Sequence, residues 1–198
     1  MNYLAHSYLS FGDSEILVGN MISDYVKGKK KFDYPLAIQK GIMLHRTIDT
    51  FTDTHPATKA AIVFFKPVVG TYAGAFVDVV YDHFLAKDET EFPGETLSIF
   101  ASDAYKKLSE YYDLLPERFQ RMLPHMINQN WLLNYRTMNG IENSFAGIFR
   151  RAKYIEYTKE AFQQFEKYYS KLQDYYTTFF ADVKNMALQE YKLLKTEL

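Results

Sequence analysis

The chain contains no cysteine among its 198 residues. Disulfide bridges, zinc–thiolate sites and a cysteine nucleophile are therefore excluded, as is the disulfide framework that small secreted domains commonly use. The first fifteen residues have neither a basic opening nor a long apolar run, which argues against a signal peptide. The most apolar stretches, AAIVFF and FVDVVYDHFLA, are too short or too charged to cross a bilayer. We expect a cytoplasmic protein without membrane insertion.

Several catalytic motifs are absent as well. No Glu-x-x-His occurs, which argues against a ferritin-like di-iron bundle. The glycine-rich nucleotide-binding loops and the G-x-S-x-G elbow of serine hydrolases are also missing. Excess charge is lacking too: 23 Lys and Arg balance 24 Asp and Glu, so nothing in the net charge of −1 attracts nucleic acid.

Strand signals are weak, whereas aromatic residues are abundant. The 17 Tyr and 16 Phe supply a large area for packing, and the hydrophobic content of 47% is ordinary for a soluble protein. The length fits one domain over residues 1–198 with a sizeable core. We predict an all-α fold, a single-domain helical bundle.

Proline, glycine and capping residues predict where the helices begin and end. Asp13 or Ser14 caps a helix that runs to about Lys27. A second helix begins at Pro35 and ends near Asp53. Further helices are expected over 57–66, 71–87, 95–113, 117–123, 125–138 and 141–152.

The last fifty residues have the clearest periodicity. Apolar residues recur there at steps of three and four, which predicts a long C-terminal helix at about 155–195 with one apolar stripe. The stripe consists of Phe162, Phe165, Tyr169, Leu172, Tyr176, Phe179, Val183 and Met186. We expect it to pack on the domain; the alternative is a helix that associates with a partner or a second copy, which leaves a homo-oligomer open.

Residues 41–56, GIMLHRTIDTFTDTHP, place polar groups beside an apolar stripe. His45 and Asp49 are four residues apart and therefore share one face of a helix. A carboxylate at the edge of a core is costly unless a cation or hydrogen-bond donors accompany it. A surface row of ion pairs that includes Arg46 is an equally good interpretation of this segment alone.

A second cluster favours a metal. Asp78 and Asp82 are also four apart and His83 follows them, in a segment whose other residues are mostly apolar. Two carboxylates on one face of a buried helix repel each other and lose hydration unless a cation lies between them. Arg or Lys from another helix could supply that charge, but the basic residues of the first half lie mostly in predicted loops.

Two further candidates, His6 and Asp24, lie in the apolar segments NYLAHSYL and GNMISDYVKG. Each is weak evidence alone. Nitrogen and oxygen ligands without sulfur suit Mn, Fe, Co or Mg better than a structural zinc, and such an ion would activate water and hold a phosphate oxygen. The combined candidate set is His6, Asp24, His45, Asp49, Asp78, Asp82 and His83.

Basic residues provide candidates for the substrate side. The segment YVKGKKKF forms a positive loop, which is either a solvated charge run or a landing surface for an acidic partner or a phosphate. Arg46 is well suited to phosphoryl oxygens because its guanidinium fork matches them, and Arg150–Arg151 is a weaker candidate. The loop lysines are Lys27, Lys29, Lys30 and Lys31.

Five blocks in order, MNYLAH, GNMISDYVKG, GIMLHRTIDTFTDTHP, VVYDHFL and WLLNYR, resemble the acyl carrier protein phosphodiesterase (acyl carrier protein hydrolase) family. They fall between residues 1 and 136, and the rest of the chain is similar only in being helical and aromatic. The resemblance implies hydrolysis of the phosphodiester that joins 4′-phosphopantetheine to the serine of holo acyl carrier protein, which leaves apo carrier protein. It also implies a manganese requirement and an HD-domain-like fold.

The chain departs from the usual HD signature, because it contains no His-Asp dipeptide. It has the reversed Asp82-His83 and the spaced His45 and Asp49 instead. The family is a divergent HD group, so this departure leaves the exact ligand set open.

The resemblance and the residues together assign roles. Asp49 is a ligand, a partner of His45 or the base that orients the attacking water; Arg46 steadies the phosphoryl charge. His83 or His45 protonates the departing serine oxygen, and the lysine loop docks the acidic carrier protein. The expected metal ligands are His6, Asp24, His45, Asp78 and Asp82, for Mn²⁺ or else Mg²⁺, Fe²⁺ or Co²⁺.

Two alternatives remain open at this point. An HD-like phosphohydrolase of a nucleotide or small phosphate ester has the same metal site, and only a panel of substrates distinguishes it. A non-catalytic helical module would bind carrier protein through the basic loop and the aromatic helix, and Asp78→Ala or His45→Ala would then abolish no turnover. The predicted buried pair of Asp78 and Asp82 argues against that module, because it is expensive without a metal.

Overall fold

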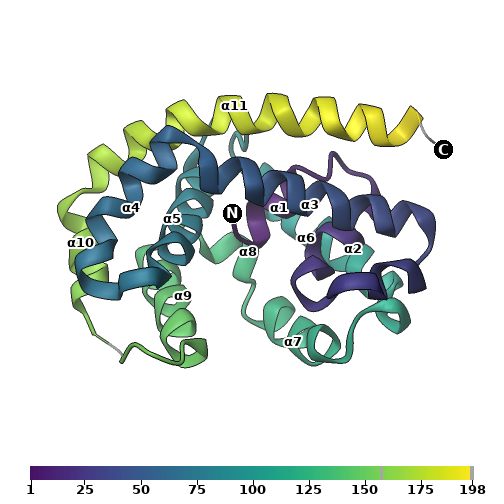
Figure 1. Ribbon diagram of the computed structural model, residues 1–198, viewed down its shortest axis with the longest axis horizontal. Coiled ribbons are helices and arrows are strands. Elements are labelled where there is room, and N and C mark those ends of the chain that lie inside the picture. Colours follow the sequence, from purple (N-terminus) through teal and green to yellow (C-terminus); the bar gives the residue numbers. More distant parts are fainter. Residues whose placement is uncertain (157, 197–198) are drawn as a thin grey trace.

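The computed structural model describes residues 1–156 and 158–196, and all regular structure in these ranges is helical (Figure 1). This confirms the all-α prediction. The α-helices are α1 (Tyr3–Tyr8), α2 (Ser14–Ile22), α3 (Leu36–Thr54), α4 (Pro56–Val69), α5 (Ala73–Lys87), α6 (Thr96–Glu110), α7 (Glu117–Asn128), α8 (Trp131–Asn134), α9 (Met138–Arg151), α10 (Glu160–Lys167) and α11 (Tyr169–Thr196). Short 3₁₀ turns are η1 (Ser23–Tyr25), η2 (Gly28–Asp33), η3 (Gly70–Tyr72) and η4 (Tyr112–Leu114).

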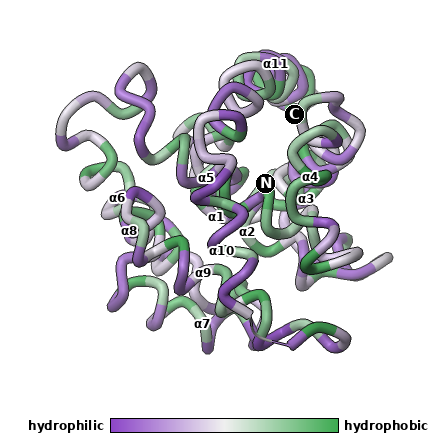
Figure 2. Tube along the Cα trace, turned by 90° about the vertical axis from the view of Figure 1, so that its left-hand side faces the viewer, coloured by the Kyte–Doolittle hydropathy of each residue, from purple (hydrophilic) through white to green (hydrophobic). Residues whose placement is uncertain are grey.

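The helices surround one core with the N-terminal segment in its middle. Figures 1 and 2 both place α11 along one side of the molecule and α7 and α9 on the opposite side, with α1 and the N-terminus between them. Helix α11 packs along α3 and α4, and it buries the inner part of its predicted stripe. The buried residues of α11 recur at steps of three and four between exposed polar ones, as expected for a helix with one packed face.

Predicted boundaries hold where a local signal decides them. Helix α2 begins at Ser14, and the Asp13 carboxylate accepts hydrogen bonds from the first-turn amides of Glu15 and Ile16 at 3.1 Å. Helix α3 follows Pro35 directly. However, α2 ends at Ile22 rather than near Lys27, because η1 tightens the chain and an extended, buried Val26 follows it.

Two other predicted boundaries are wrong. The helix expected over 155–195 is two helices, α10 and α11, which meet at a non-helical Tyr168 whose ring stacks on Phe64 at 4.1 Å. The break expected after residue 123 does not occur: α7 runs through Pro124 to Asn128, and the chain turns only at Asn130, in the left-handed conformation. Tertiary packing and a single αL residue override the local signals in these cases.

Residues Pro56–Lys87 are, by length and composition, apolar enough to span a membrane. This is weak evidence, because a core helix passes the same test. In the structure the segment is the two helices α4 and α5, and the chain turns between them at Gly70, where φ is +56°. Phe65, Phe76 and Val77 are fully buried in the core, although only 33% of the most apolar window of the segment is buried.

Helices α2 and α3 cross at two glycines. A Cβ on Gly41 would lie 2.4 Å from the carbonyl oxygen of Ile16, and one on Gly19 would lie 2.1 Å from that of Ile38. The two backbones therefore approach more closely than any side chain permits. Because His45 lies one turn beyond Gly41 on α3, this crossing fixes the distance between His45 and the N-terminal helices.

We expect Gly41→Ala to lower the free energy of unfolding by about 2 kcal/mol or more, since the new methyl group meets backbone rather than a movable side chain. The matched control is Gly74→Ala on α5, where a Cβ meets no atom within 4 Å and helix propensity improves. Urea unfolding followed by circular dichroism measures both. Equal stability of Gly41→Ala and the unchanged protein would contradict the close crossing.

Candidate metal centre

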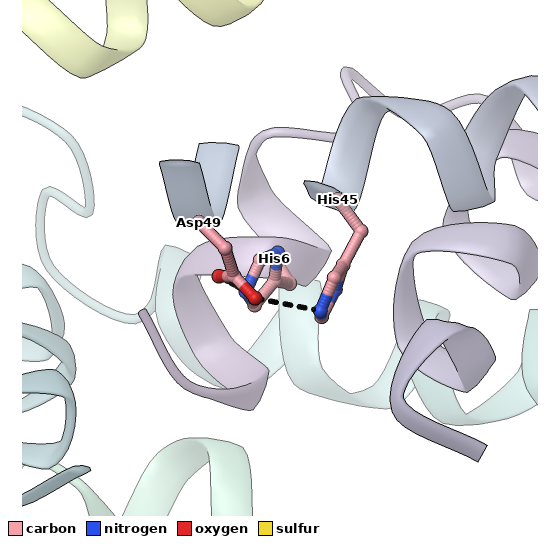
Figure 3. A group of neighbouring side chains, drawn as sticks. All are labelled: His6, His45 and Asp49. Atoms are coloured by element: carbon pink, nitrogen blue, oxygen red, sulfur yellow. Dashed lines mark ion pairs between the residues drawn. The ribbon is translucent and has the colours of Figure 1, made fainter. Parts of the chain in front are cut away.

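Three of the predicted residues converge in the middle of the fold (Figure 3). His6 comes from α1, whereas His45 and Asp49 lie one turn apart on α3. The imidazole rings of the two histidines stack with centroids 4.0 Å apart, and the Asp49 carboxylate reaches both: Oδ1 lies 3.2 Å from His6 Nε2 and Oδ2 lies 3.0 Å from His45 Nε2. Each residue can offer one ligand atom, and these atoms all lie within 4.8 Å of one another.

The proton of His6 is placed by Asn20. The Asn20 amide nitrogen donates to the backbone oxygen of His6 at 2.9 Å and to Ser10 Oγ at 3.1 Å, so its oxygen faces His6 Nδ1 at 2.8 Å. Nδ1 therefore carries the proton of the neutral ring, and the lone pair of Nε2 points toward Asp49. Burial, and next the nearby His45, lower the pKa of His6 to about 4, so the ring is neutral at pH 7.

A neutral Nε2 and a carboxylate oxygen 3.2 Å apart both present lone pairs, which repel unless a cation lies beside them. His6 Nε2 is also among the few buried polar atoms that have no hydrogen-bond partner in the described ranges. Buried polar atoms are almost always paired, so an unpaired nitrogen beside a carboxylate fits a site for a cation.

His45 is held in the opposite electrostatic state. Burial lowers its pKa, but the carboxylates of Asp24 and Asp49 outweigh burial and raise the pKa to about 9. Its Nε2 lies 3.6 Å from Asp24 Oδ1, yet neither ring nitrogen makes a hydrogen bond of good geometry within the described chain. The carboxylates of Asp24 and Asp49 thus favour a positive charge at His45 Nε2, and a metal ion can supply that charge in place of the proton.

The remaining carboxylates of the group are ionised. The close contacts with the His45 and His6 nitrogens outweigh burial and hold the pKa of Asp49 far below its usual range. The contact with His45 likewise lowers the pKa of Asp24, whose side chain is 75% exposed. Two imidazole nitrogens and carboxylate oxygens, partly buried and incompletely paired, are a donor set that fits a divalent cation.

Asp78 is close to this group but has another partner. Its Oδ1 lies 3.0 Å from the α-ammonium nitrogen of Met1, which is also 3.6 Å from Asp49 Oδ1. Burial lowers the pKa of the ammonium group, but Asp78 and Asp49 raise it to about 10. The cation beside Asp78 is this ammonium group, and Asp78 is not one of the three residues whose ligand atoms lie within 4.8 Å of one another.

Asp82 also lies apart from the histidines. Its carboxylate is fully buried and accepts hydrogen bonds from the backbone amides of Leu4 at 2.7 Å and of Asn2 and Ala5 at 3.3 Å. Burial raises its pKa to about 7, although these amides act in the opposite direction. The sequence analysis expected a metal ion to stabilise the Asp82 carboxylate. The unpaired amides at the start of α1 stabilise it instead, by donating hydrogen bonds.

His83 points into a different part of the core. Its Nδ1 lies 2.7 Å from the carbonyl oxygen of Tyr135 and its Nε2 lies 2.9 Å from the hydroxyl of Tyr169, so both nitrogens are occupied. Burial lowers its pKa to about 4. Asp82 and His83 are adjacent in sequence, but neighbouring residues on a helix point about 100° apart, so their side chains enter different parts of the core.

The predicted basic residues lie on the outside of the group. Arg46 donates from Nη2 to the carbonyl oxygen of Val26 at 3.0 Å. A groove of 390 Å³ extends from the lysine loop to the histidine group and is lined by Lys27, Arg46, His45 and Asp49 among others. Lys29 and Lys30 are exposed on η2, and Lys31 is half-buried with its ammonium over the Phe32 ring.

A cavity of 520 Å³ reaches the same group and shares Asp24, Lys27 and His45 with the groove. His6, His45, Asp24 and Asp78 line it together with two arginines that sequence reasoning missed or ranked low, Arg118 and Arg151. Asn20 was missed as well. No local pattern identifies these residues, because α7, α9 and α2 bring them together from distant parts of the chain.

The fold and the site define a helical protein with a central His/His/Asp group suited to a divalent cation. The family model for acyl carrier protein phosphodiesterase matches residues 1–183, and the chain belongs to this family. It is 31% identical to the acyl carrier protein phosphodiesterase of Yersinia pestis over 94% of this chain and 97% of that protein. The proteins of that name from Klebsiella pneumoniae and Serratia proteamaculans are 30% and 31% identical over the same shares. No solved structure matches the chain significantly.

We expect the protein to bind Mn²⁺ through this group and Asp49→Ala to weaken that binding by at least about tenfold, because Asp49 contacts both histidines. Electron paramagnetic resonance of free Mn²⁺ measures the affinity, and thermal unfolding measures the accompanying stabilisation. The control is Asp53→Ala, an exposed carboxylate one turn further along α3. Equal Mn²⁺ affinity of the two variants would place the ion elsewhere.

Proposed function

We propose that this protein is a metal-dependent phosphodiesterase that removes 4′-phosphopantetheine from holo acyl carrier protein and leaves apo carrier protein. One observation carries the proposal: a group of two buried histidines and a half-buried aspartate, with unpartnered nitrogens, borders two openings whose linings include positive side chains as well as carboxylates. The names of the relatives supply the substrate class.

His6, His45 and Asp49 are the residues that would hold the metal, with the Asp24 carboxylate near enough to His45 to join them. Nitrogen and oxygen ligands without sulfur favour Mn²⁺, with Mg²⁺, Fe²⁺ or Co²⁺ as alternatives. When bound, such an ion supplies Lewis-acid polarisation of a phosphoryl oxygen and activation of the attacking water.

The chain's own residues orient the reactants. Asn20 holds the His6 ring with Nε2 toward the cavity, and Asp82 fixes the start of the helix that carries His6. Asp24 is ionised and exposed beside His45, so it can accept a proton from the attacking water and return it to the serine oxygen. Water oxygen ends on phosphorus, the bond between phosphorus and the serine oxygen breaks, and the serine hydroxyl is restored.

Positive side chains would stabilise the phosphoryl charge from both openings. Arg151 and Arg118 line the cavity, and Lys27 lines both the cavity and the groove. Guanidinium groups suit the phosphoryl oxygens because they donate two hydrogen bonds in one plane. Arg46, whose guanidinium is tied to Val26, would add positive potential at the groove rather than a direct contact.

The lysine loop is our candidate for the docking surface of the carrier protein. Lys27, Lys29, Lys30 and Lys31 project from one short segment, and the groove connects this segment to the histidine group. Phe32 is 62% exposed beside them, so the surface offers apolar as well as positive contacts. An acidic carrier protein would be attracted there and would present its serine to the groove. We propose the cytoplasm as the location of this activity, because the relatives are bacterial proteins named for a carrier-protein substrate.

The activity is tested by incubating holo acyl carrier protein with this protein and Mn²⁺ and weighing the products by mass spectrometry. We expect the carrier protein to lose the mass of phosphopantetheine, and both a chelator and Asp49→Ala to abolish that loss. Nucleotides and small phosphate esters serve as competing substrates. Turnover of those alone, or no turnover of an authentic holo partner, would refute the proposal.

Docking through the loop predicts a salt-dependent effect. Lys29→Gln combined with Lys30→Gln should lower kcat/KM for holo carrier protein severalfold at low salt, and the difference should shrink as salt is raised. The control removes two exposed lysines elsewhere, Lys167→Gln with Lys171→Gln, at the same change in net charge. Equal effects of the two double variants would show that net charge, rather than the loop, attracts the substrate.

A further inference from the structure

A second cavity, of 640 Å³, adjoins the first. Residues of α7, α8 and α9 line it together with Asn2 and Tyr3, and none of the loop lysines does. Asn2, Tyr3 and Arg151 line both cavities, so the two are continuous at these residues. A ligand that reaches the histidines from this side therefore passes Arg151.

The lining of the second cavity differs in chemistry from that of the first. No carboxylate lines it within the described chain, whereas Asp24, Asp78 and Glu117 line the first cavity. Its aromatic side chains are Tyr3, Trp131 and Tyr135, which offer flat apolar faces. Its side-chain amides, which both donate and accept hydrogen bonds, are Asn2, Asn128, Gln129, Asn134 and Asn143.

Two guanidinium groups converge at its wall. A Cβ added to Gly147 would lie 3.4 Å from Arg151 Nη1 and 3.7 Å from Arg150 Nη2, so both groups lie close to the same point. No Asp or Glu of the described residues forms an ion pair with either arginine. Like charges that approach without a counter-ion favour the binding of an anion between or beside them.

We propose that the second cavity is the subsite for the pantetheine arm of the substrate. The phosphate lies at the junction beside Arg151, and the arm extends past Arg150 over Trp131 and the amide side chains. This inference rests on the proposed function and adds the direction of the substrate: the serine side enters by the groove at the lysine loop, and the arm extends into the second cavity.

The chemistry of the arm matches the lining. Pantetheine carries two amide groups separated by short aliphatic segments and has no charge of its own, while its phosphate is anionic. Amide side chains can pair with both the N–H and C=O groups of such an arm, and aromatic faces can cover the aliphatic segments. The absence of carboxylates from this lining removes a repulsive contact with the phosphate at the junction.

Trp131 is the only tryptophan in the chain, so its fluorescence reports on this cavity alone. We expect 4′-phosphopantetheine, titrated into the metal-free protein, to change that fluorescence with a saturable curve. Pantetheine should bind more weakly because it lacks the phosphate, and inorganic phosphate should leave the signal nearly unchanged because it does not reach the indole.

Two substitutions test the lining. Asn143→Ala removes one amide and Arg150→Gln removes one positive charge, and each should weaken 4′-phosphopantetheine binding by about fivefold or more. The matched control is Asn139→Ala, an exposed asparagine one turn earlier on α9 and outside the cavity lining, which should bind as the unchanged protein does. Circular dichroism checks that all three variants fold.

The outcomes separate this inference from the proposed function. Hydrolysis of holo carrier protein, with no response of Trp131 to 4′-phosphopantetheine, would overturn the subsite and leave the activity standing. An equal effect of Asn139→Ala and Asn143→Ala would also overturn it. Saturable binding with the expected ranking of variants supports the subsite, and a protein that binds the arm but never cleaves holo carrier protein refutes the proposed function instead.

Discussion

The buried carboxylate of Asp82 determines where the N-terminal segment lies, and the central site depends on that placement. Asp82 belongs to α5, and it accepts the amide hydrogens of Asn2, Leu4 and Ala5 at the start of α1. These amides have no partner inside their own helix, so the carboxylate and the helix end satisfy each other. The contact holds α1 on α5 and brings His6 against His45 from α3. The histidine group is formed by α1 and α3, and its geometry depends on α5, which contributes none of the three residues of the group.

The three carboxylates of this region differ in the groups that lie next to them. Asp82 has backbone amides and Asp78 has the Met1 ammonium group at 3.0 Å, whereas Asp49 lies 3.6 Å from that ammonium group and reaches two histidine nitrogens, one of them without a proton. The nitrogen donors that an ion could use are therefore gathered around Asp49, although all three residues are carboxylates at or near the core. This difference in partners, rather than the number of acidic residues, defines the position suited to an ion.

Two openings with different linings reach the histidine group, so the two ends of a bound substrate would meet different surroundings. The groove leads to an exposed, positive and partly apolar loop, whereas the first cavity adjoins a second one that is lined by amides, aromatic rings and two arginines. A phosphodiester has two different substituents, and two chemically different openings can distinguish them. The helical bundle suits this arrangement because α3 can present its polar face to a channel while its apolar face packs against α11.

The sequence by itself determined the helical class, most helix positions and the candidates His6, His45 and Asp49, because periodicity, capping residues and i, i+4 spacing are local properties. Only the tertiary structure decided which candidates share a site. Asp78 and Asp82 have the same spacing as His45 and Asp49, yet packing gives them an ammonium group and helix amides as partners. The roles open to Asn20 and Arg151 could not be read from the chain, since they depend on helices that meet only when the core forms. Local pattern specifies which groups face inward; the contacts between distant helices specify what each of them meets.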